Sequence, residues 1–268
     1  MTTIQRPVGE LIRRWRERRR ISQLDLAISA EISTRHLSFV ETGRANPSRE
    51  MVLRLGEHLD VPLRERNQLL LAAGYAPAYS ESRLDDPELA IARDAVRRVL
   101  AGHEPYPAVV VDRYWNLVDG NTSVGLLTEG VAPDLLAPPA NVLRLALHPD
   151  GMAPRIRNLG EWRADLLGRL RRQVEMTGDP ELDRLLDEVR EYPGDEPEAG
   201  FPRRGDIFVP LRLCHEGTEL SFFSTIATFG TPVEITLSEL AIESFYPADD
   251  ATGEYVRRLA AARGTIGA

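Results

Sequence analysis

The stretch from residue 22 to residue 48, SQLDLAISAEISTRHLSFVETGRANPS, constrains the fold of this chain more than any other. Ser22 and Ser33 each precede a short run with apolar residues at helical spacing, and serine is a favoured residue at the start of a helix. Gly43 follows the second run, where a left-handed residue commonly ends a helix. The apolar positions are Leu26, Ala27 and Ala30 in the first run and Leu37 and Val40 in the second. The stretch therefore predicts two short amphipathic helices joined by a tight turn.

Three more amphipathic segments flank this pair, at residues 8–19, 49–59 and 63–73. Each has apolar residues on one helical face, so five short helices around one small core are predicted for residues 1–80. In a helix-turn-helix of this kind, the second helix enters the major groove of DNA. The first unit is therefore expected to be an all-α DNA-binding domain.

With these features the first unit resembles the lambda-repressor-like, or xenobiotic-response-element (XRE), helix-turn-helix domain. The residues that match that family's pattern are Gln23, Leu26-Ala27 and Glu41-Thr42-Gly43. Glu31 stands where the turn often has glycine, so we expect a positive φ at this residue. The resemblance also implies that Glu41 pairs with Arg16 of the first helix.

The resemblance implies two kinds of DNA contact. Phosphate contacts are expected where helices start, because the N-terminal end of a helix favours an anion, and just beyond the second helix. These positions are Gln23, Ser33, Arg44 and Asn46. The outward face of the second helix carries Thr34, Arg35, Ser38 and Phe39. Of these, Thr34, Arg35 and Ser38 are expected to contact bases. Arg35 would bind guanine through O6 and N7, a contact worth about 1–3 kcal/mol of discrimination.

A helix pair of this kind also occurs in folds that bind protein, and the charge distribution bears on this alternative. Residues 1–80 contain 13 Arg against 9 Asp and Glu, a net charge of +4. Residues 81–268 carry a net charge of −12, which gives the chain its total of −8. A basic segment confined to the helix-turn-helix end of an acidic chain favours double-stranded DNA as the partner.

At 268 residues the chain is long enough for two domains, each with its own core. Cys214 is the single cysteine, which excludes an intrachain disulfide and fits a reducing cytoplasm. The sequence has no signal-peptide pattern and no apolar run of about 18 residues, so we expect a cytoplasmic protein with no membrane partner. Lysine is absent and all 33 basic residues are arginine, a coding bias that indicates a bacterial source.

Residues 74–86 interrupt the helical pattern with Pro77, small residues and charges. A connector at residues 81–104 is predicted to form a helix, with Asp86 as its cap and Pro87 at its first position. Its apolar stripe leaves two alternatives open. The helix either packs into the core of the second domain or forms a dimer seam that couples the two domains.

The pattern changes after this connector, and residues 105–268 are predicted to form an α+β domain. Short β-branched runs predict strands at 107–112 and 115–121, and three further strand-like runs occupy 206–214, 219–230 and 233–247. The predicted helices of this domain are 141–149, 159–178, 180–192 and 251–261. Two strands, a helical insertion and three strands predict a five-stranded antiparallel sheet with helices on one face.

This order of elements resembles a PAS-like sensor domain. More specifically, it resembles the MmyB-like ligand-binding domain, which occurs fused behind the same type of DNA-binding domain. The matching pieces are Val111-Asp112-x-x-Trp115-Asn116, Asn121, Asn141-x-x-Arg144-Leu145, His148-Pro149, Trp162 and residues 222–230. The two resemblances together cover nearly the whole chain, and the loop after residue 190 matches least.

The resemblance implies a cavity between sheet and helices that holds a small hydrophobic ligand, with fatty acids as the leading class. The lining candidates are Trp115, Leu145, Trp162, Phe222 and Phe223. Asn121 or Arg144 is the candidate for contact with the polar head of the ligand. Core packing is the alternative for each aromatic residue, because large aromatics fill the core of a sheet domain more often than they line a pocket.

Neither a catalytic site nor a metal site is predicted. The five histidines form no metal-spaced pair, and His215 beside Cys214 lacks a third partner. Without lysine the chain cannot carry a phosphate-binding P-loop, and the glycine fingerprint of dinucleotide domains and the nucleophile elbow are absent. We therefore expect no enzyme activity and no cofactor.

These patterns together predict a ligand-responsive transcription regulator that binds its operator as a homodimer. The alternative is a DNA-binding adaptor whose C-terminal sheet binds a protein partner and no small molecule. A catalytic C-terminal domain is a weaker hypothesis, because the sequence shows no cluster of acid and base groups.

Overall fold

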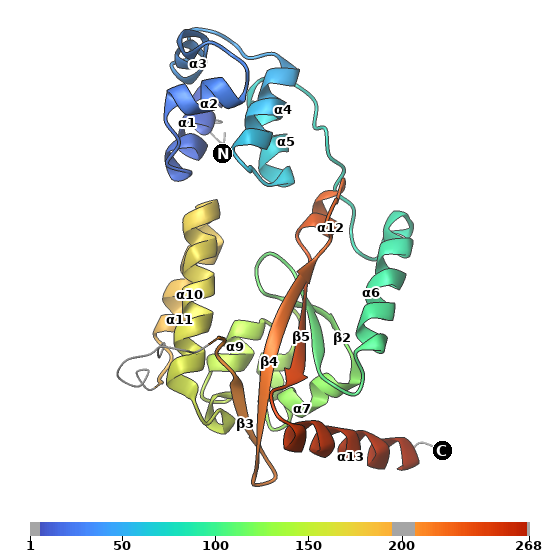
Figure 1. Ribbon diagram of the computed structural model, residues 1–268. Coiled ribbons are helices and arrows are strands. Elements are labelled where there is room, and N and C mark those ends of the chain that lie inside the picture. The colour runs from blue at the N-terminus through green and yellow to red at the C-terminus, as the bar shows by residue number, and fades with distance from the viewer. Residues whose placement is uncertain (1–5, 195–206, 267–268) are drawn as a thin grey trace. The chain divides into compact units, whose positions relative to one another are not determined.

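The computed structural model describes residues 6–194 and 207–266 (Figure 1). The chain forms two compact units. The first consists of Met1–Asp86 and Thr231–Ser238, and the second consists of Pro87–Gly230 and Glu239–Ala268. The first unit is helical and the second combines a sheet with helices, so the predicted all-α and α+β classes are confirmed.

The first unit contains the five predicted helices. They are α1 (Val8–Arg18), α2 (Gln23–Ser29), α3 (Thr34–Glu41), α4 (Arg49–His58) and α5 (Leu63–Ala72). The side chains of Ser22, Ser33 and Ser48 each accept a hydrogen bond from the backbone N–H three residues later. Loss of one such cap typically costs about 1 kcal/mol. The largest side chains buried between these helices are Ile12, Leu26, Leu37, Leu55, Leu59, Leu69 and Leu70.

Backbone geometry brings α3 close to α1 and α2. A Cβ on Gly9 of α1 would lie 2.0 Å from the carbonyl oxygen of Val40, so this close approach requires glycine. Glu31, in the turn before α3, has a φ of 53°, which confirms the positive φ expected from the sequence. Gly43 has a φ of 72° just after α3, as predicted for a left-handed helix end.

A short segment of the first unit comes from far along the chain. α12 (Ile235–Ser238) contacts α5, and residues 231–238 belong to the first unit although they lie between two strands of the second. The N–H of Ile235 donates to the Ser80 carbonyl oxygen at 2.9 Å. Thr236 Oγ1 donates to the Ser82 carbonyl oxygen at 2.6 Å. We refer to residues 231–238 as the inserted segment.

The prediction of one strand over residues 233–247 is therefore wrong in its first half, because residues 233–238 belong to the inserted segment. Glu234 Oε2 accepts a hydrogen bond from the N–H of Leu237 at 2.7 Å and caps the short helix. Glu234 Oε1 accepts from the N–H of Ser82 at 2.8 Å. A bond to a residue 152 positions earlier cannot be inferred from local strand propensity.

The second unit is built on a five-stranded antiparallel sheet with the order β2-β1-β5-β4-β3, which confirms the predicted strand number and direction. The strands are β1 (Ala108–Val111), β2 (Leu117–Gly120), β3 (Leu211–His215), β4 (Thr218–Thr228) and β5 (Ala241–Pro247). β1 and β5 are neighbours although about 130 residues separate them in the sequence. The central strands are thus completed only when the chain returns from the helical insertion.

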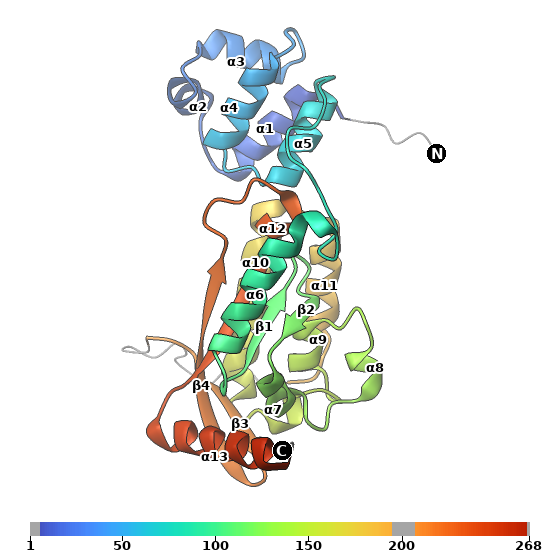
Figure 2. The ribbon, with the colours of Figure 1, turned by 90° about the vertical axis from the view of Figure 1, so that its right-hand side faces the viewer.

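Helices cover both faces of this sheet in Figures 1 and 2. α6 (Ala90–Gly102) lies on one face and buries Val96 and Leu100, which supports the core-packing alternative for the connector. The other face is covered by the helical insertion, so the expectation of helices on one face was incomplete. The remaining helices are α7 (Gly125–Thr128), α8 (Pro133–Leu136), α9 (Val142–Leu147), α10 (Leu159–Thr177), α11 (Pro180–Arg190) and α13 (Asp250–Ile266).

The start of the connector differs from the prediction. Asp86 does not cap a helix, because its Oδ2 accepts a hydrogen bond from the N–H of Arg83 at 2.7 Å, and the 3-10 helix Pro87–Leu89 precedes α6. Most of the predicted loop at 193–202 lies outside the described residues. Within the described ranges, no helix is both long and apolar enough to cross a membrane.

Candidate DNA interface and ligand pocket

The outward face of α3 carries polar and basic side chains. Arg35 is exposed, and Thr34, Ser38 and Phe39 are half-buried beside it. The guanidinium of Arg35 lies 5.4 Å from the centroid of the Phe39 ring, within the range of a cation–π contact. This contact gives Phe39 a role in holding the Arg35 side chain on the exposed face.

The predicted phosphate contacts lie around this face. Ser33 is exposed at the start of α3, and Arg44 and Asn46 are exposed just after it. Gln23 is half-buried, and its Nε2 donates to Glu41 Oε2 at 2.7 Å. Because a primary amide has two N–H groups, this bond does not use all of the donors of Gln23.

The Glu41 carboxylate is buried and joins the first three helices. Arg16 Nε donates to Glu41 Oε1 at 2.7 Å and Arg16 Nη2 donates to Oε2 at 2.9 Å, as the resemblance implied. The hydrogen bond to Glu41 raises the pKa of the Arg16 guanidinium. With Gln23 from α2 as its further partner, Glu41 fixes the orientation of α3 against α1 and α2.

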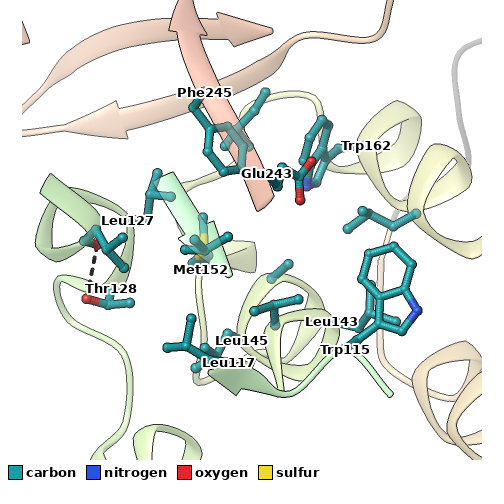
Figure 3. Close-up of a pocket in the computed structure, with 16 residues that line it drawn as sticks. Trp115, Leu117, Leu127, Thr128, Leu143, Leu145, Met152, Trp162, Glu243 and Phe245 are labelled. Carbon is teal, nitrogen blue, oxygen red and sulfur yellow. Dashed lines mark hydrogen bonds between the residues drawn. The ribbon is translucent and has the colours of Figure 1, made fainter. Parts of the chain in front are cut away.

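An apolar pocket of about 60 Å³ lies in the second unit, between the sheet and the helical insertion (Figure 3). Sixteen residues line it. The sheet contributes Val109, Leu117, Leu211, Glu243 and Phe245, and the other elements contribute Trp115, Val124, Leu127, Thr128, Val142, Leu143, Leu145, Ala146, Met152, Trp162 and Leu166. Apolar walls with a few polar groups are typical of a small-molecule site.

A strained turn holds Trp115 in this wall. Trp115 has a φ of 66°, a left-handed value that is costly for a bulky residue unless its surroundings enforce it. Asp112 Oδ1 accepts from the N–H groups of Tyr114 at 2.8 Å and of Asn116 at 2.9 Å, and these bonds close the turn. Asn141 Nδ2 adds a bond to the Tyr114 carbonyl oxygen at 2.8 Å. This network gives Asp112, Asn116 and Asn141 of the sequence motif a structural role.

The two tryptophans of the pocket differ in their hydrogen bonds. Trp115 Nε1 donates to Gln173 Oε1 at 2.7 Å, and Gln173 Nε2 in turn donates to the Arg113 carbonyl oxygen at 2.7 Å. Trp162 is 3% exposed, and its buried Nε1 has no hydrogen-bond partner in the described part of the chain. A buried N–H without a partner is unusual and calls for an explanation.

Comparison with known families agrees with both halves of this architecture. Residues 92–259, well over half of the chain, match the MmyB-like transcription regulator ligand binding domain. The chain belongs to this family. Residues 7–69 of this MmyB-like regulator match a helix-turn-helix domain. The families matched are thus those of transcription regulators, with a DNA-binding domain followed by a ligand-binding domain.

Comparisons with curated proteins and with solved structures add little information about this MmyB-like regulator. The search of curated proteins finds no match. A solved structure titled "Structure of an RNA-binding Light-Oxygen-Voltage Receptor" is 14% identical, and the match covers 95% of this chain and 64% of that one. Its TM-score is 0.27, at which the likeness says nothing about fold or function.

Three of the seven predicted ligand residues of the MmyB-like regulator line the pocket: Trp115, Leu145 and Trp162. Phe222 is fully buried in the core and is not one of the sixteen lining residues. Phe223 is also outside the lining and stacks on Tyr246, with ring centroids 5.2 Å apart. The alternation of the strand places neighbouring residues on opposite faces, which is why Phe222 and Phe223 cannot share one role.

The two residues proposed for the ligand head serve other contacts in this regulator. Asn121 accepts from the N–H of Ala108 at 3.1 Å and donates to the Tyr106 carbonyl oxygen at 2.7 Å, so it fixes the start of β1. Arg144 makes two hydrogen bonds to Glu188 of α11, at 2.7 and 2.8 Å. Neither residue is among the sixteen that line the pocket.

Glu243 is the lining residue that the sequence interpretation missed. It lies on β5 within the run Ala241–Pro247, on the same face as the pocket residue Phe245. The side chain of Glu243 is 9% exposed and accepts hydrogen bonds from Ser224 and Arg169. A charged residue in an otherwise apolar strand alternation is the signal that could have identified it.

The histidine and cysteine next to each other at the end of β3 have separate surroundings. His215 Nε2 lies 2.7 Å from Glu129 Oε2, and Nδ1 lies 2.8 Å from the Tyr255 hydroxyl. Cys214 is half-buried. In the described part of the chain, no group of three or more His, Cys, Asp or Glu residues has the arrangement of a metal site.

Proposed function

We propose that this protein is a sequence-specific transcription regulator that responds to a small, fatty-acid-like hydrophobic ligand. The apolar pocket in the MmyB-like domain is the observation that carries this proposal. Its walls are mostly aliphatic and aromatic, which favours a ligand whose larger part is apolar. Because operators are chromosomal, the proposed place of action is the cytoplasm.

The pocket volume limits the shape of the ligand. On the same measure, one water needs about 10–15 Å³, so a cavity of about 60 Å³ holds the equivalent of only a few waters. A short apolar molecule enters with little rearrangement. A long acyl chain requires lining side chains to move, and Met152 is the most adaptable of them.

The proposed operator contact uses the exposed face of α3. Thr34, Arg35 and Ser38 contact base edges, and Phe39 supports Arg35. Gln23, Ser33, Arg44 and Asn46 contact phosphates and position α3. We propose a homodimer on an inverted repeat, because one helix-turn-helix reads only a half-site and two-fold symmetric dimers read two.

The inserted segment offers a route for regulation. Residues 231–238 belong to the DNA-binding unit, and β5 continues from them directly to the pocket residues Glu243 and Phe245. A ligand that moves β5 therefore acts on a strand that is continuous with the DNA-binding unit. Regulation further requires that the ligand bind two states of the protein with different affinities.

A protein partner is the second candidate for the sensor domain. Phe223 stacks on Tyr246 and lies 5.3 Å from Phe208, centroid to centroid. Phe208 is 49% exposed and Tyr246 is 36% exposed. Exposed aromatic side chains of this kind are enriched at protein interfaces, which favours an adaptor role if the pocket holds no ligand.

The test is native mass spectrometry of the purified full-length protein, followed by organic extraction and identification of released molecules. We expect a bound small hydrophobic molecule and a dimer mass. A protein that is empty and also binds no member of a lipid panel would contradict the sensor proposal and support the protein partner. A strictly monomeric mass, with and without DNA, would contradict the inverted-repeat operator.

A further inference from the structure

We propose that two copies of this chain associate through the outer edge of residues 223–228 in β4, where the two strands pair antiparallel around a two-fold axis at Ile226. This inference rests on the proposed homodimer and deepens it, because it names the surface at which the copies meet. β3 pairs only with residues 218–222 of β4, and Figure 1 shows the rest of β4 running on past β3. Among the described residues, no strand pairs with the outer edge of residues 223–228, which we call the free edge.

The direction of the backbone groups of β4 follows first from the contacts of Ser221. Its N–H donates to Thr252 Oγ1 at 3.0 Å, and its carbonyl oxygen accepts from the N–H of Ala248, just after β5, at 2.8 Å. The backbone of Ser221 therefore faces the side of β5. Successive residues of a strand direct their backbone groups to opposite edges, and the register of β4 with β5 is regular over residues 222–228.

The turn between β3 and β4 gives the same assignment from the other side. Its two residues, Glu216 and Gly217, have φ values of 47° and 79°, as in a type I′ hairpin turn. The hydrogen bond of such a turn joins the residues that flank it, so Thr218 faces β3, and every second residue of β4 does the same. Beyond the end of β3, the residues that direct their backbone groups to the free edge are Ser224, Ile226 and Thr228.

The chain itself covers the other outer edges of this sheet. Next to β3, the N–H of Arg157 donates to the Arg212 carbonyl oxygen at 2.8 Å, and Asn158 Oδ1 accepts from the N–H of Arg212 at 3.1 Å. Next to β2, the N–H of Leu117 donates to the Ala140 carbonyl oxygen at 2.7 Å. Proteins cover their sheet edges in this way because an open edge pairs with another chain.

The free edge also lacks the protection that charges or proline give to an exposed strand. Residues 220–231 contain no charged residue and no proline, although 28% of the chain is charged. Residues 225–228 are all exposed, and the side chain of Ile226 is 51% exposed. This half of β4 is thus open on both faces as well as at its edge. A neutral, exposed strand of this kind is a template for the addition of a further strand.

A second copy of β4 is the partner that fits this edge best. In antiparallel pairing around an axis at Ile226, this residue faces its own copy and Ser224 faces Thr228 of the other copy. All three direct their backbone groups outward, so this register forms about six hydrogen bonds between the copies. Near a two-fold axis a charged side chain faces a like charge, which is unfavourable, and residues 220–231 carry no charge. A strongly charged peptide finds no opposite charge in this run.

The experiment places charges at the proposed axis. Ile226→Arg and Ile226→Glu each bring two like charges together, so each variant alone should dimerise at least about tenfold more weakly than the wild type. An equimolar mixture of the two variants should form a heterodimer, because opposite charges then meet at the axis. Sedimentation equilibrium of the full-length protein measures the dimer dissociation constant. Native mass spectrometry identifies the heterodimer when one variant is isotope-labelled.

Val118→Arg and Val118→Glu are the matched controls. Val118 is an aliphatic residue that is 36% exposed on β2, at the opposite end of the strand order. These variants should leave the dimer dissociation constant unchanged. Unchanged dimerisation of Ile226→Arg and Ile226→Glu would overturn the proposal. A mixture that forms no more dimer than either Ile226 variant alone would overturn the pairing of Ile226 with its own copy.

Amide hydrogen exchange of the wild-type protein is a second test, which needs no variant. The peptide that spans residues 223–228 should exchange more slowly at a protein concentration where the dimer forms than after dilution to the monomer. Peptides from β3, whose edge the chain covers, should exchange equally at both concentrations. Equal exchange of residues 223–228 would overturn the proposal, and slow exchange at every concentration would do so by showing that the edge is covered within one chain.

The outcomes separate this inference from the proposed function. If the protein is a dimer that the Ile226 variants leave intact, the homodimer stands and only the surface is wrong. A protein that is monomeric at every concentration, with and without DNA, contradicts the homodimer and this surface together. Circular dichroism checks that each variant is folded, and hydrogen exchange of the wild type decides the question if the Ile226 variants do not fold.

Discussion

Arg16 of α1 and Glu41 of α3 form a two-point ion pair inside the DNA-binding unit, with Nε–Oε1 and Nη2–Oε2 distances of 2.7 and 2.9 Å. The Glu41 side chain is 1% exposed, so this pair is shielded from water and salt. The two residues lie 25 positions apart in the sequence, and the pair connects the last residue of α3 to the first helix. The orientation of the proposed DNA-contacting face therefore depends on it.

Replacement of Glu41 by Gln should destabilise the DNA-binding unit strongly. Breaking a buried ion pair by removing one partner typically costs about 3–5 kcal/mol, because the other charge stays buried. Urea unfolding followed by circular dichroism measures this change. Glu17→Gln is the control, since Glu17 pairs with Arg13 at the surface, where an ion pair contributes little to stability. Equal effects of both variants would contradict a structural role for Glu41.

Arg35→Ala and Arg44→Ala should weaken DNA binding in different ways. Without Arg35, discrimination at one operator position should fall by about 1–3 kcal/mol, because a base contact is lost. Without Arg44, binding to all sequences should weaken alike and the salt dependence of binding should become shallower. Fluorescence anisotropy with operator variants at several salt concentrations measures both effects. The same pattern of loss in the two variants would show that the assignment of base and phosphate contacts is wrong.

Trp115→Ala should weaken ligand binding and leave operator affinity without ligand nearly unchanged. The indole forms part of the pocket wall and is held by the hydrogen bond to Gln173. Truncation of a large buried aromatic also costs about 3–5 kcal/mol of stability, so folding must be checked by thermal unfolding. Phe223→Ala is the control for an aromatic residue outside the pocket lining. Unchanged ligand affinity in Trp115→Ala would remove Trp115 from the site.

The inserted segment provides a test of coupling. Glu234 accepts hydrogen bonds from the N–H groups of Ser82 and Leu237, and Glu234→Gln turns one of these acceptors into a donor. We expect unchanged ligand affinity but a smaller effect of ligand on operator binding, with a loss of about 0.5–2 kcal/mol in the coupling free energy. Val233→Ala is the matched control, because Val233 is 79% exposed in the same segment. Full coupling in Glu234→Gln would show that the segment does not transmit the signal.

The Arg144–Glu188 pair predicts a pH dependence of stability. The hydrogen bond from Arg144 lowers the pKa of Glu188 in the folded state, and burial and the bond to Glu188 raise the pKa of Tyr192 to about 12. Because the folded pKa of Glu188 is lowered, the pair stabilises above the ordinary glutamate pKa and is lost as pH falls through the folded value. The pair is partly exposed, which limits its contribution to about 1 kcal/mol or less.

Wild type and Arg144→Gln should therefore converge in stability in acid. The difference in the free energy of unfolding between the two proteins should be present at pH 7 and should be lost as pH falls below the ordinary glutamate pKa and through the lowered pKa of folded Glu188. Urea unfolding across this range measures it. A difference that stays constant from pH 7 to pH 3 would show that Arg144 acts through packing and not through its charge.

Much of the fold follows from local patterns of the sequence. Ser22, Ser33 and Gly43 mark helix ends that the structure reproduces, and Glu31 has the positive φ that its place in the turn requires. Helix caps and turn conformations depend on a few neighbouring residues, so they are visible in sequence. The five strands were also predicted, since alternation and β-branched residues are local properties.

Part of the candidate site could be predicted in the same way and part could not. Trp115, Leu145 and Trp162 were named through resemblance to a family and line the pocket. Arg144 was proposed for the ligand head, but its long side chain reaches Glu188 on a different helix. A flexible arginine can reach several partners, so sequence alone does not predict which partner it contacts.

The sequence by itself specified the two domain classes, the helix-turn-helix and the strands, because helical periodicity, capping and strand alternation are encoded within short windows. Tertiary packing determined the contacts between segments that lie far apart in the sequence. It joined residues 231–238 to the DNA-binding unit, brought Glu243 of β5 and Trp162 of α10 into the lining of one pocket, and left the Trp162 N–H without a partner among the described residues. These relationships arise between residues about 80 to 150 positions apart, where the outcome depends on how whole elements pack and not on the preferences of any one segment.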